Sequence, residues 1–138
     1  MGKEPLTSLA LLLLRLGVGG LMLALHGLQK LLGFDALVSD FADPIGLGSA
    51  ASLSLAIFAE VLCSGLIAVG LGTRLAAVPL AVTMVVAAFV VHGEDPMAAR
   101  ERALLYLVPT VVLILTGPGR FSLDALVGNK RKKRAPLL

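Results

Sequence analysis

The sequence predicts an all-α membrane protein, a four-transmembrane-helix bundle with a short amphipathic helix in the first outer loop. Three observations predict this fold class. Of the 138 residues, 57% are hydrophobic and 15% are charged, and the mean hydropathy is +0.94. The apolar residues fall into four separate stretches, and the basic residues gather between and after them. Because a soluble domain of this size cannot bury so much apolar surface, we expect one transmembrane domain over residues 1–128 and a basic cytoplasmic tail over 129–138.

The first span is expected at about residues 6–32, which exceeds the roughly 20 apolar residues that cross the hydrocarbon. The stretch is too long for the apolar region of a signal peptide, so we expect it to be retained. Spacings of three or four residues place a series of positions on one helix face: Arg15, Gly19, Met22, His26 and then Gln29 or Lys30. We expect this polar face to point into the bundle.

The first outer loop follows this span. Apolar residues recur there at helical spacing and acidic residues take the other side, until Pro44 and Gly46 interrupt the pattern. This arrangement predicts a short amphipathic helix between about residues 34 and 45 that lies on the outer surface and covers a cavity below it.

The second span is expected at about 49–72, and it holds one ionised side chain, Glu60, well away from its ends. At 1.5 Å per residue, Arg15 lies about 13 Å and Glu60 about 17 Å from the inner ends of their helices. A lone charge at bilayer depth is costly, so we expect Arg15 and Glu60 to form an intramembrane ion pair. A structural role for this pair is favoured over a proton-handling role.

The third and fourth spans are expected at about 74–92 and 97–116. Asp95 and Pro96 supply a helix-start signal for the fourth span, and Arg100, Glu101 and Arg102 fall in its first turns, at the membrane interface. The chain contains one cysteine, Cys63, so no disulfide and no site with several cysteine ligands forms within one chain.

The loops predict the orientation. With both termini in the cytoplasm, eight basic residues lie inside and three outside, which satisfies the positive-inside rule. The inner set is Lys3, Arg74, Arg120, Lys130, Arg131, Lys132, Lys133 and Arg134, and the outer set is Lys30, Arg100 and Arg102. We therefore interpret the net charge of +3 as membrane anchoring by anionic lipid, not as nucleic-acid binding. We expect three residues to anchor the protein at the inner surface: Arg74 and Arg120 of this basic set, and the acidic residue Asp124.

Helix counting also brings polar residues together near the outer boundary, because His26 and His92 lie about 30 Å and 26 Å from the inner helix ends. The candidates for a ligand site there are His26, Gln29, Lys30, His92, Glu101 and Tyr106. A quinone headgroup needs hydrogen-bond donors for its two carbonyl oxygens, protons on reduction and lipid access for its tail, which such a mouth provides. The alternative is that these side chains, and Arg102 with them, reach the interface or bond the outer loops. No metal site is expected, since no ligand spacing presets one.

Several short segments, in order and spacing, match a known family over nearly the whole chain. They are Arg15-Leu16-Gly17, His26-Gly27-Leu28-Gln29-Lys30-Leu31, Glu60-Val61-Leu62, Gly70-Leu71-Gly72-Thr73-Arg74, His92-Gly93, Glu101 before Ala103-Leu104-Leu105-Tyr106, and Gly117-Pro118-Gly119-Arg120-Phe121-Ser122-Leu123-Asp124. The chain resembles the DoxX family. The resemblance implies a four-helix membrane protein related to DoxD, the membrane subunit of thiosulfate:quinone oxidoreductase, and to subunits linked to redox stress defence.

Three functions remain open. The first, which we prefer, is a DoxX-like inner-membrane subunit of a redox or respiratory complex that binds a quinone headgroup near the outer face, with the electron donor on a partner protein. The second is a non-catalytic accessory subunit that packs against a larger membrane complex. The third, a small transporter, is disfavoured because four short helices leave little lumen. We expect the partners to be the lipid bilayer and other redox subunits, and the only cofactor to be a non-covalently bound quinone. Whether the chain itself is an enzyme is left open.

Overall fold

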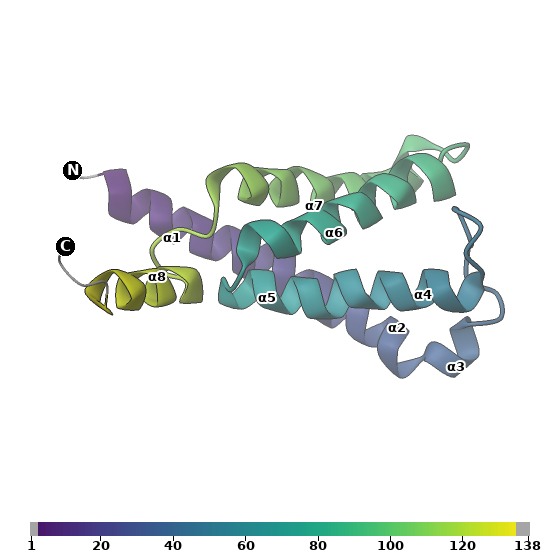
Figure 1. Ribbon diagram of the computed structural model, residues 1–138. Helices are drawn as coiled ribbons and strands as arrows, with labels where there is room; N and C mark the ends of the chain where they lie inside the picture. The colour runs from purple at the N-terminus through teal and green to yellow at the C-terminus, as the bar shows by residue number, and fades with distance from the viewer. Residues whose placement is uncertain (1–2, 135–138) are drawn as a thin grey trace.

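The computed structural model describes residues 3–134, and every regular element in this part of the chain is helical (Figure 1). Four long rods follow one another along the chain. The first rod contains α1 (Lys3–Arg15), two π-helical segments, η1 (Leu16–Gly20) and η2 (Leu23–Gly27), and α2 (Leu28–Leu32). The second contains α4 (Ser49–Ile57), η3 (Phe58–Cys63) and α5 (Ser64–Val69); the third contains α6 (Thr73–Val86) and η4 (Ala87–Val91); the fourth is α7 (Met97–Thr116). A further helix, α8 (Leu123–Arg134), follows the fourth rod, and the last residues of the expected tail, 135–138, lie outside the described residues.

Among the described residues, three helices are long and apolar enough to cross a membrane: Glu4–Leu32, Ser49–Val69 and Thr73–Val91. The helix α7 is 20 residues long but carries Arg100, Glu101 and Arg102 near its start, and it is not one of these three. Large apolar side chains point away from every rod; Leu13, Leu75 and Leu115 are 62%, 80% and 73% exposed. Such a surface suits lipid and not water.

The rods run back and forth along the long axis of the molecule. In Figure 1, the start of α1 and α8 lie at one end, which we call the α8 end, while α3 and the connection before α7 lie at the other, the loop end. The third and fourth rods pack closely along each other, and the core between the rods includes Met22, Ile67, Leu80 and Leu113, all buried.

The first outer loop holds less helix than the sequence predicts. The helix α3 (Phe34–Leu37) is a single turn, and residues 38–48 form turns and bends. The carboxylate of Asp43 organises this segment, because it accepts hydrogen bonds from the N–H groups of Leu47 and Gly48 and from the hydroxyl of Ser52, each 2.9 Å long. These bonds, led by that from Gly48, lower the pKa of Asp43 below its ordinary value. The loop is thereby tied to the start of α4 instead of continuing as a helix.

The first two rods touch at two glycines. A Cβ atom at Gly19 would lie 2.5 Å from the backbone oxygen of Ser64, and one at Gly27 would overlap the backbone oxygen of Glu60. The two contacts set which residues of these antiparallel rods face each other: η1 lies against α5, and η2 lies against η3.

Candidate functional site

Glu60 forms its ion pair with Lys30. The distance from Lys30 Nζ to Glu60 Oε2 is 2.5 Å, and the Glu60 side chain is 6% exposed while that of Lys30 is 23% exposed. Lys30 lies near the loop end of the first rod, and Glu60 lies near the middle of the second. The expected ion pair between Arg15 and Glu60 is therefore wrong.

Arg15 instead lies near the α8 end, fully buried, and bonds to backbone carbonyls. Its Nη1 donates to the Ala68 oxygen at 3.2 Å, and its Nη2 donates to the Phe121 oxygen. Asp124 is the acidic residue whose charge acts on this guanidinium. Helix dipoles leave partial negative charge on C-terminal carbonyls, so a guanidinium at the end of α5 is electrostatically favourable.

The two glycine contacts explain the exchange of partners. Gly27 faces Glu60, and Arg15 comes 12 residues earlier on the first rod, which corresponds to about 18 Å along a helix. The depth estimate from the sequence assumed that both helices start at the same level. The first rod in fact extends further toward the α8 end than the second rod does. Arg15 therefore lies beside the last turn of the second rod, and Lys30 lies beside Glu60.

The two glycine-containing segments after the second and fourth rods fold against each other at the α8 end. Asp124 Oδ1 and Oδ2 accept hydrogen bonds from the N–H groups of Gly72, at 2.7 Å, and Thr73, at 3.1 Å, and thus cap the start of α6. The N–H of Asp124 donates to the oxygen of Gly70, at 2.8 Å. Gly70 has a φ of +76° and a neighbouring Arg15 guanidinium where a Cβ would stand, so only glycine fits there.

The remaining anchoring candidates lie beside this contact. Arg74 Nη2 donates to the oxygens of Leu115 and Thr116, the last carbonyls of α7, at 3.3 Å each. Arg120 is exposed, and its backbone N–H donates to Ser8 Oγ at 3.4 Å. Ser122 Oγ accepts from the N–H of Ala125, at 3.2 Å, at the start of α8. The α8 end is therefore a network that closes the bundle.

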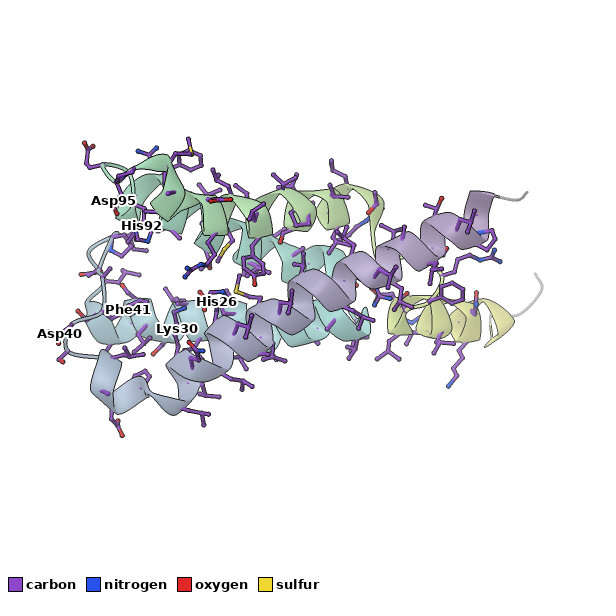
Figure 2. All side chains as sticks on the ribbon, turned by 180° about the vertical axis from the view of Figure 1, so that it is seen from behind. His26, Lys30, Asp40, Phe41, His92 and Asp95 are labelled. Atoms are coloured by element: carbon purple, nitrogen blue, oxygen red, sulfur yellow. The ribbon has the colours of Figure 1, made fainter. Side chains whose placement is uncertain are left out.

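The loop end contains a cavity of about 180 Å³ lined by polar side chains from three rods and the connection after the third, which we call the polar cavity. Its functional groups are His26, Lys30, Glu60, His92, Arg102 and Tyr106, with Met22 and Met84 on its walls. His26 and His92, which the sequence places at similar depth, both line this cavity. Figure 2 shows His26, Lys30 and His92 in the loop-end half of the molecule, and Phe41 of the outer loop lines a neighbouring cavity together with Lys30 and His92.

The geometry within the polar cavity favours exchange of hydrogen bonds and protons. The rings of His26 and Tyr106 meet edge to face, with centroids 5.4 Å apart. His92 Nδ1 lies 2.7 Å from Asp95 Oδ2, which is half exposed at the mouth. Arg100 donates to the backbone oxygens of His92 and Gly93 and thus holds the end of the third rod. The cavity therefore combines two imidazoles, a phenol and a partly buried ion pair with an acidic group at its edge.

Two of the sequence candidates lie outside the polar cavity. Gln29 is exposed and does not line it, and Glu101 is exposed and lines a separate groove on the far side of α7. Lys30 instead of Gln29 faces inward because His26 lies in the π-helical η2, whose wider turn shifts the following residues around the helix. On α7 the inward positions are Ala99, Arg102, Ala103 and Tyr106, so the adjacent Glu101 points away.

Two apolar hollows adjoin the polar cavity, and sequence reasoning missed most of their walls. The loop cavity, about 440 Å³, lies between the outer loop, the second rod and the third rod and shares Lys30, Glu60, Ala87 and His92 with the polar cavity. The lateral groove, about 500 Å³, lies between the first rod and α7 and shares His26, Arg102 and Tyr106. The amphipathic pattern around Phe41 was the only signal of a covered hollow, because the other walls come from the packing of separate rods.

The chain is similar in sequence to known proteins. The family model DoxX matches residues 10–93, which contain Arg15, His26, Lys30, Glu60 and His92. The chain is 34% identical over 120 residues to "Uncharacterized membrane protein Rv3486" of Mycobacterium tuberculosis, covering 76% of this chain and 74% of that protein. It is 33% identical over 122 residues to "Putative oxidoreductase CatD" of Bacillus subtilis, covering 88% of this chain and 89% of that protein.

No solved structure matches the chain. The family match covers more than half of the 138 residues and most of the first three rods, including both members of the Lys30–Glu60 pair. Together with the three apolar helices, it shows that this chain is a membrane protein of the DoxX family.

Proposed function

We propose that this protein is a cytoplasmic-membrane subunit of a redox complex that binds a quinone headgroup in the polar cavity. The observation that carries the proposal is that His26 and Lys30 of the first rod, His92 of the turn after the third rod and Tyr106 of α7 line one cavity with the buried Glu60. The relative from Bacillus subtilis has the word oxidoreductase in its name, which supports a redox role.

The proposal includes four membrane crossings with both termini in the cytoplasm. The helix α7 is about 30 Å long at 1.5 Å per residue, enough to cross the hydrocarbon, and it packs along α6. Two of its three charges are accommodated at the loop end, because Arg100 bonds to backbone oxygens and Arg102 lines the polar cavity. The basic residues of α8 favour the cytoplasmic side for that end of the bundle.

The cavity suits the chemistry of quinone reduction, in which the ring takes up two electrons and two protons. Imidazole and phenol groups donate hydrogen bonds to the carbonyl oxygens and supply protons, and His92 with Asp95 connects this site to the water outside. The electrons come from a redox centre on a partner protein. The polar cavity alone is smaller than the roughly 300–1,000 Å³ of ordinary ligand pockets, but the adjoining apolar hollows provide the missing volume.

The test is equilibrium binding of a radiolabelled short-tailed quinone to the purified protein in nanodiscs. We expect saturable binding that His26→Ala and His92→Ala each weaken by about tenfold or more, because each removes a hydrogen-bonding group from the cavity. Gln29→Ala and Glu101→Gln are matched controls, since both alter polar residues at similar depth outside the cavity, and they should leave affinity unchanged.

A failure to bind would favour the accessory-subunit function. If the wild-type protein binds no quinone but is recovered in a stable complex with other membrane subunits, quinone binding is wrong for this chain. If the control variants weaken binding as much as the histidine variants do, the ligand does not occupy the polar cavity.

A further inference from the structure

We infer that the loop cavity is the binding site for the apolar tail of this quinone, so that the ligand lies beneath the first outer loop between the second and third rods. This inference rests on the proposed function and adds where the tail lies and which class of ligand fits: an amphiphile with a neutral head and an isoprenoid or alkyl tail.

The first support is the shape of the loop cavity. It is walled on three sides, by the outer loop around Phe41 and Ile45, by the second rod around Leu55, and by the third rod from Pro79 to Val91. Pro79 and Val91 are 12 residues apart, so the cavity follows the third rod for about 18 Å from the polar site toward the membrane centre. The lateral groove, in contrast, is lined by residues of the first rod and α7 alone, the geometry of an ordinary lipid-facing groove.

The second support is the distribution of polarity. The hydroxyls that line the loop cavity are already bonded within the protein, Ser52 to Asp43 at 2.9 Å and Thr83 to the oxygen of Pro79 at 2.8 Å. The wall is therefore apolar along its length, and its charged and titratable groups, Lys30, Glu60 and His92, are at the end shared with the polar cavity. A ligand that fits must itself be polar at one end and apolar at the other.

The third support is the charge at that shared end. Lys30 is paired with Glu60, and His92 lies 2.7 Å from Asp95, so the two positive or titratable groups each have an acidic partner. The guanidinium of Arg102 lines the polar cavity outside this shared end. The side chains that the two cavities share therefore favour the uncharged ring of a quinone over the headgroup of an anionic phospholipid.

The test compares two quinones on two matched variants. Val82→Trp fills the loop cavity and Leu21→Trp fills the lateral groove; both side chains are about half exposed, 56% and 52%, so both replacements fit without disturbing the core. The ligands are decylubiquinone and the tail-less ubiquinone-0. We expect Val82→Trp to weaken decylubiquinone binding by about tenfold or more, the effect of displacing a few buried methylene groups, and to leave ubiquinone-0 binding unchanged. Leu21→Trp should leave both affinities unchanged.

The outcomes separate this inference from the proposed function. If the wild-type protein binds neither quinone, both proposals are wrong. If the wild-type protein binds both quinones and only Leu21→Trp weakens decylubiquinone binding, the tail lies in the lateral groove and this inference alone is wrong. The inference is also wrong if Val82→Trp weakens the binding of both quinones equally, or of neither.

A second measurement, photolabelling, uses the wild-type protein and needs no substitution. A decylubiquinone analogue with a photoreactive diazirine at the end of its tail should label peptides from residues 41–58 and 79–91 of the wild-type protein. Labelling confined to residues 13–25 and 102–106 would contradict the inference. In a lipid-exchange control, the inference would also be contradicted if the peptides from residues 41–58 and 79–91 carried phospholipid acyl chains instead of quinone.

Discussion

The two ends of this bundle differ in the partners of their charged side chains. At the α8 end, the fully buried Arg15 bonds to backbone oxygens of Ala68 and Phe121, and its side chain lines neither the polar cavity, the loop cavity nor the lateral groove. At the loop end, Lys30 and Glu60 bond to each other on the wall of two cavities. A charge bonded to backbone oxygens of separate segments holds those segments together, whereas a pair of side chains beside a cavity remains available to a ligand. This contrast agrees with the proposal that the α8 end stabilises the bundle and the loop end binds the ligand.

The strongest test of this contrast is Arg15→Met. The change removes the charge and leaves two carbonyl oxygens without their donor in a buried site, so we expect the free energy of unfolding to fall by about 3 kcal/mol or more. Arg15→Lys keeps the charge but replaces the planar guanidinium with one ammonium, and it should cause an intermediate loss. The measurement is reversible unfolding in mixed micelles followed by circular dichroism. Unfolding free energy equal to that of the wild type would contradict a structural role for Arg15.

Gly27→Ala should disturb the loop end by a smaller amount. The new methyl group overlaps the backbone oxygen of Glu60 and forces the first and second rods apart, which should cost about 1–3 kcal/mol. Gly17→Ala is the matched control, because a Cβ there meets no atom within 4 Å, and it should leave stability unchanged or raise it slightly. Equal effects of the two substitutions in the same unfolding assay would show that the rods do not touch at Gly27.

A double-mutant cycle tests the reassigned ion pair directly. Lys30→Met and Glu60→Gln should be coupled by about 1 kcal/mol, since Lys30 and Glu60 are in contact. Arg15→Met and Glu60→Gln should be additive within about 0.5 kcal/mol, because Arg15 has separate partners. Coupling between Arg15 and Glu60 with none between Lys30 and Glu60 would restore the pairing expected from the sequence.

The smallest expected effect is a pH dependence confined to the outer loop. The folded-state pKa of Asp43 is lowered, so its contribution to stability is present above the unfolded pKa near 3.8 and is lost as the pH falls through the lower folded value. In an NMR titration in micelles, the amide proton signals of Leu47 and Gly48 should move with a midpoint below 3.8. Asp43→Asn should abolish this titration; a midpoint at or above 3.8 would contradict the hydrogen-bonded carboxylate.

The sequence predicts the helices well and their relative depth poorly. Apolar stretches locate three helices that can span a membrane. The periodicity of the first rod predicts that His26 and either Gln29 or Lys30 face the inside of the bundle, and His26 and Lys30 line the polar cavity. The pairing of Arg15 is missed because sequence spacing gives distance along one helix, whereas its offset from the next helix depends on packing at Gly19 and Gly27. The carboxylate of Asp124 is another such case, since it caps α6, 51 residues away, and no local pattern indicates that contact.

The bond from Arg15 to Phe121 also has a consequence for biosynthesis. The two residues are separated by 106 positions, so when the first rod leaves the ribosome one of the acceptors for its guanidinium has not been translated. Until the segment after α7 arrives, Arg15 depends on water, lipid phosphate or the insertion machinery for that hydrogen bond. Chains that terminate before Phe121 therefore lack one of the two backbone acceptors of the cation in their first membrane segment.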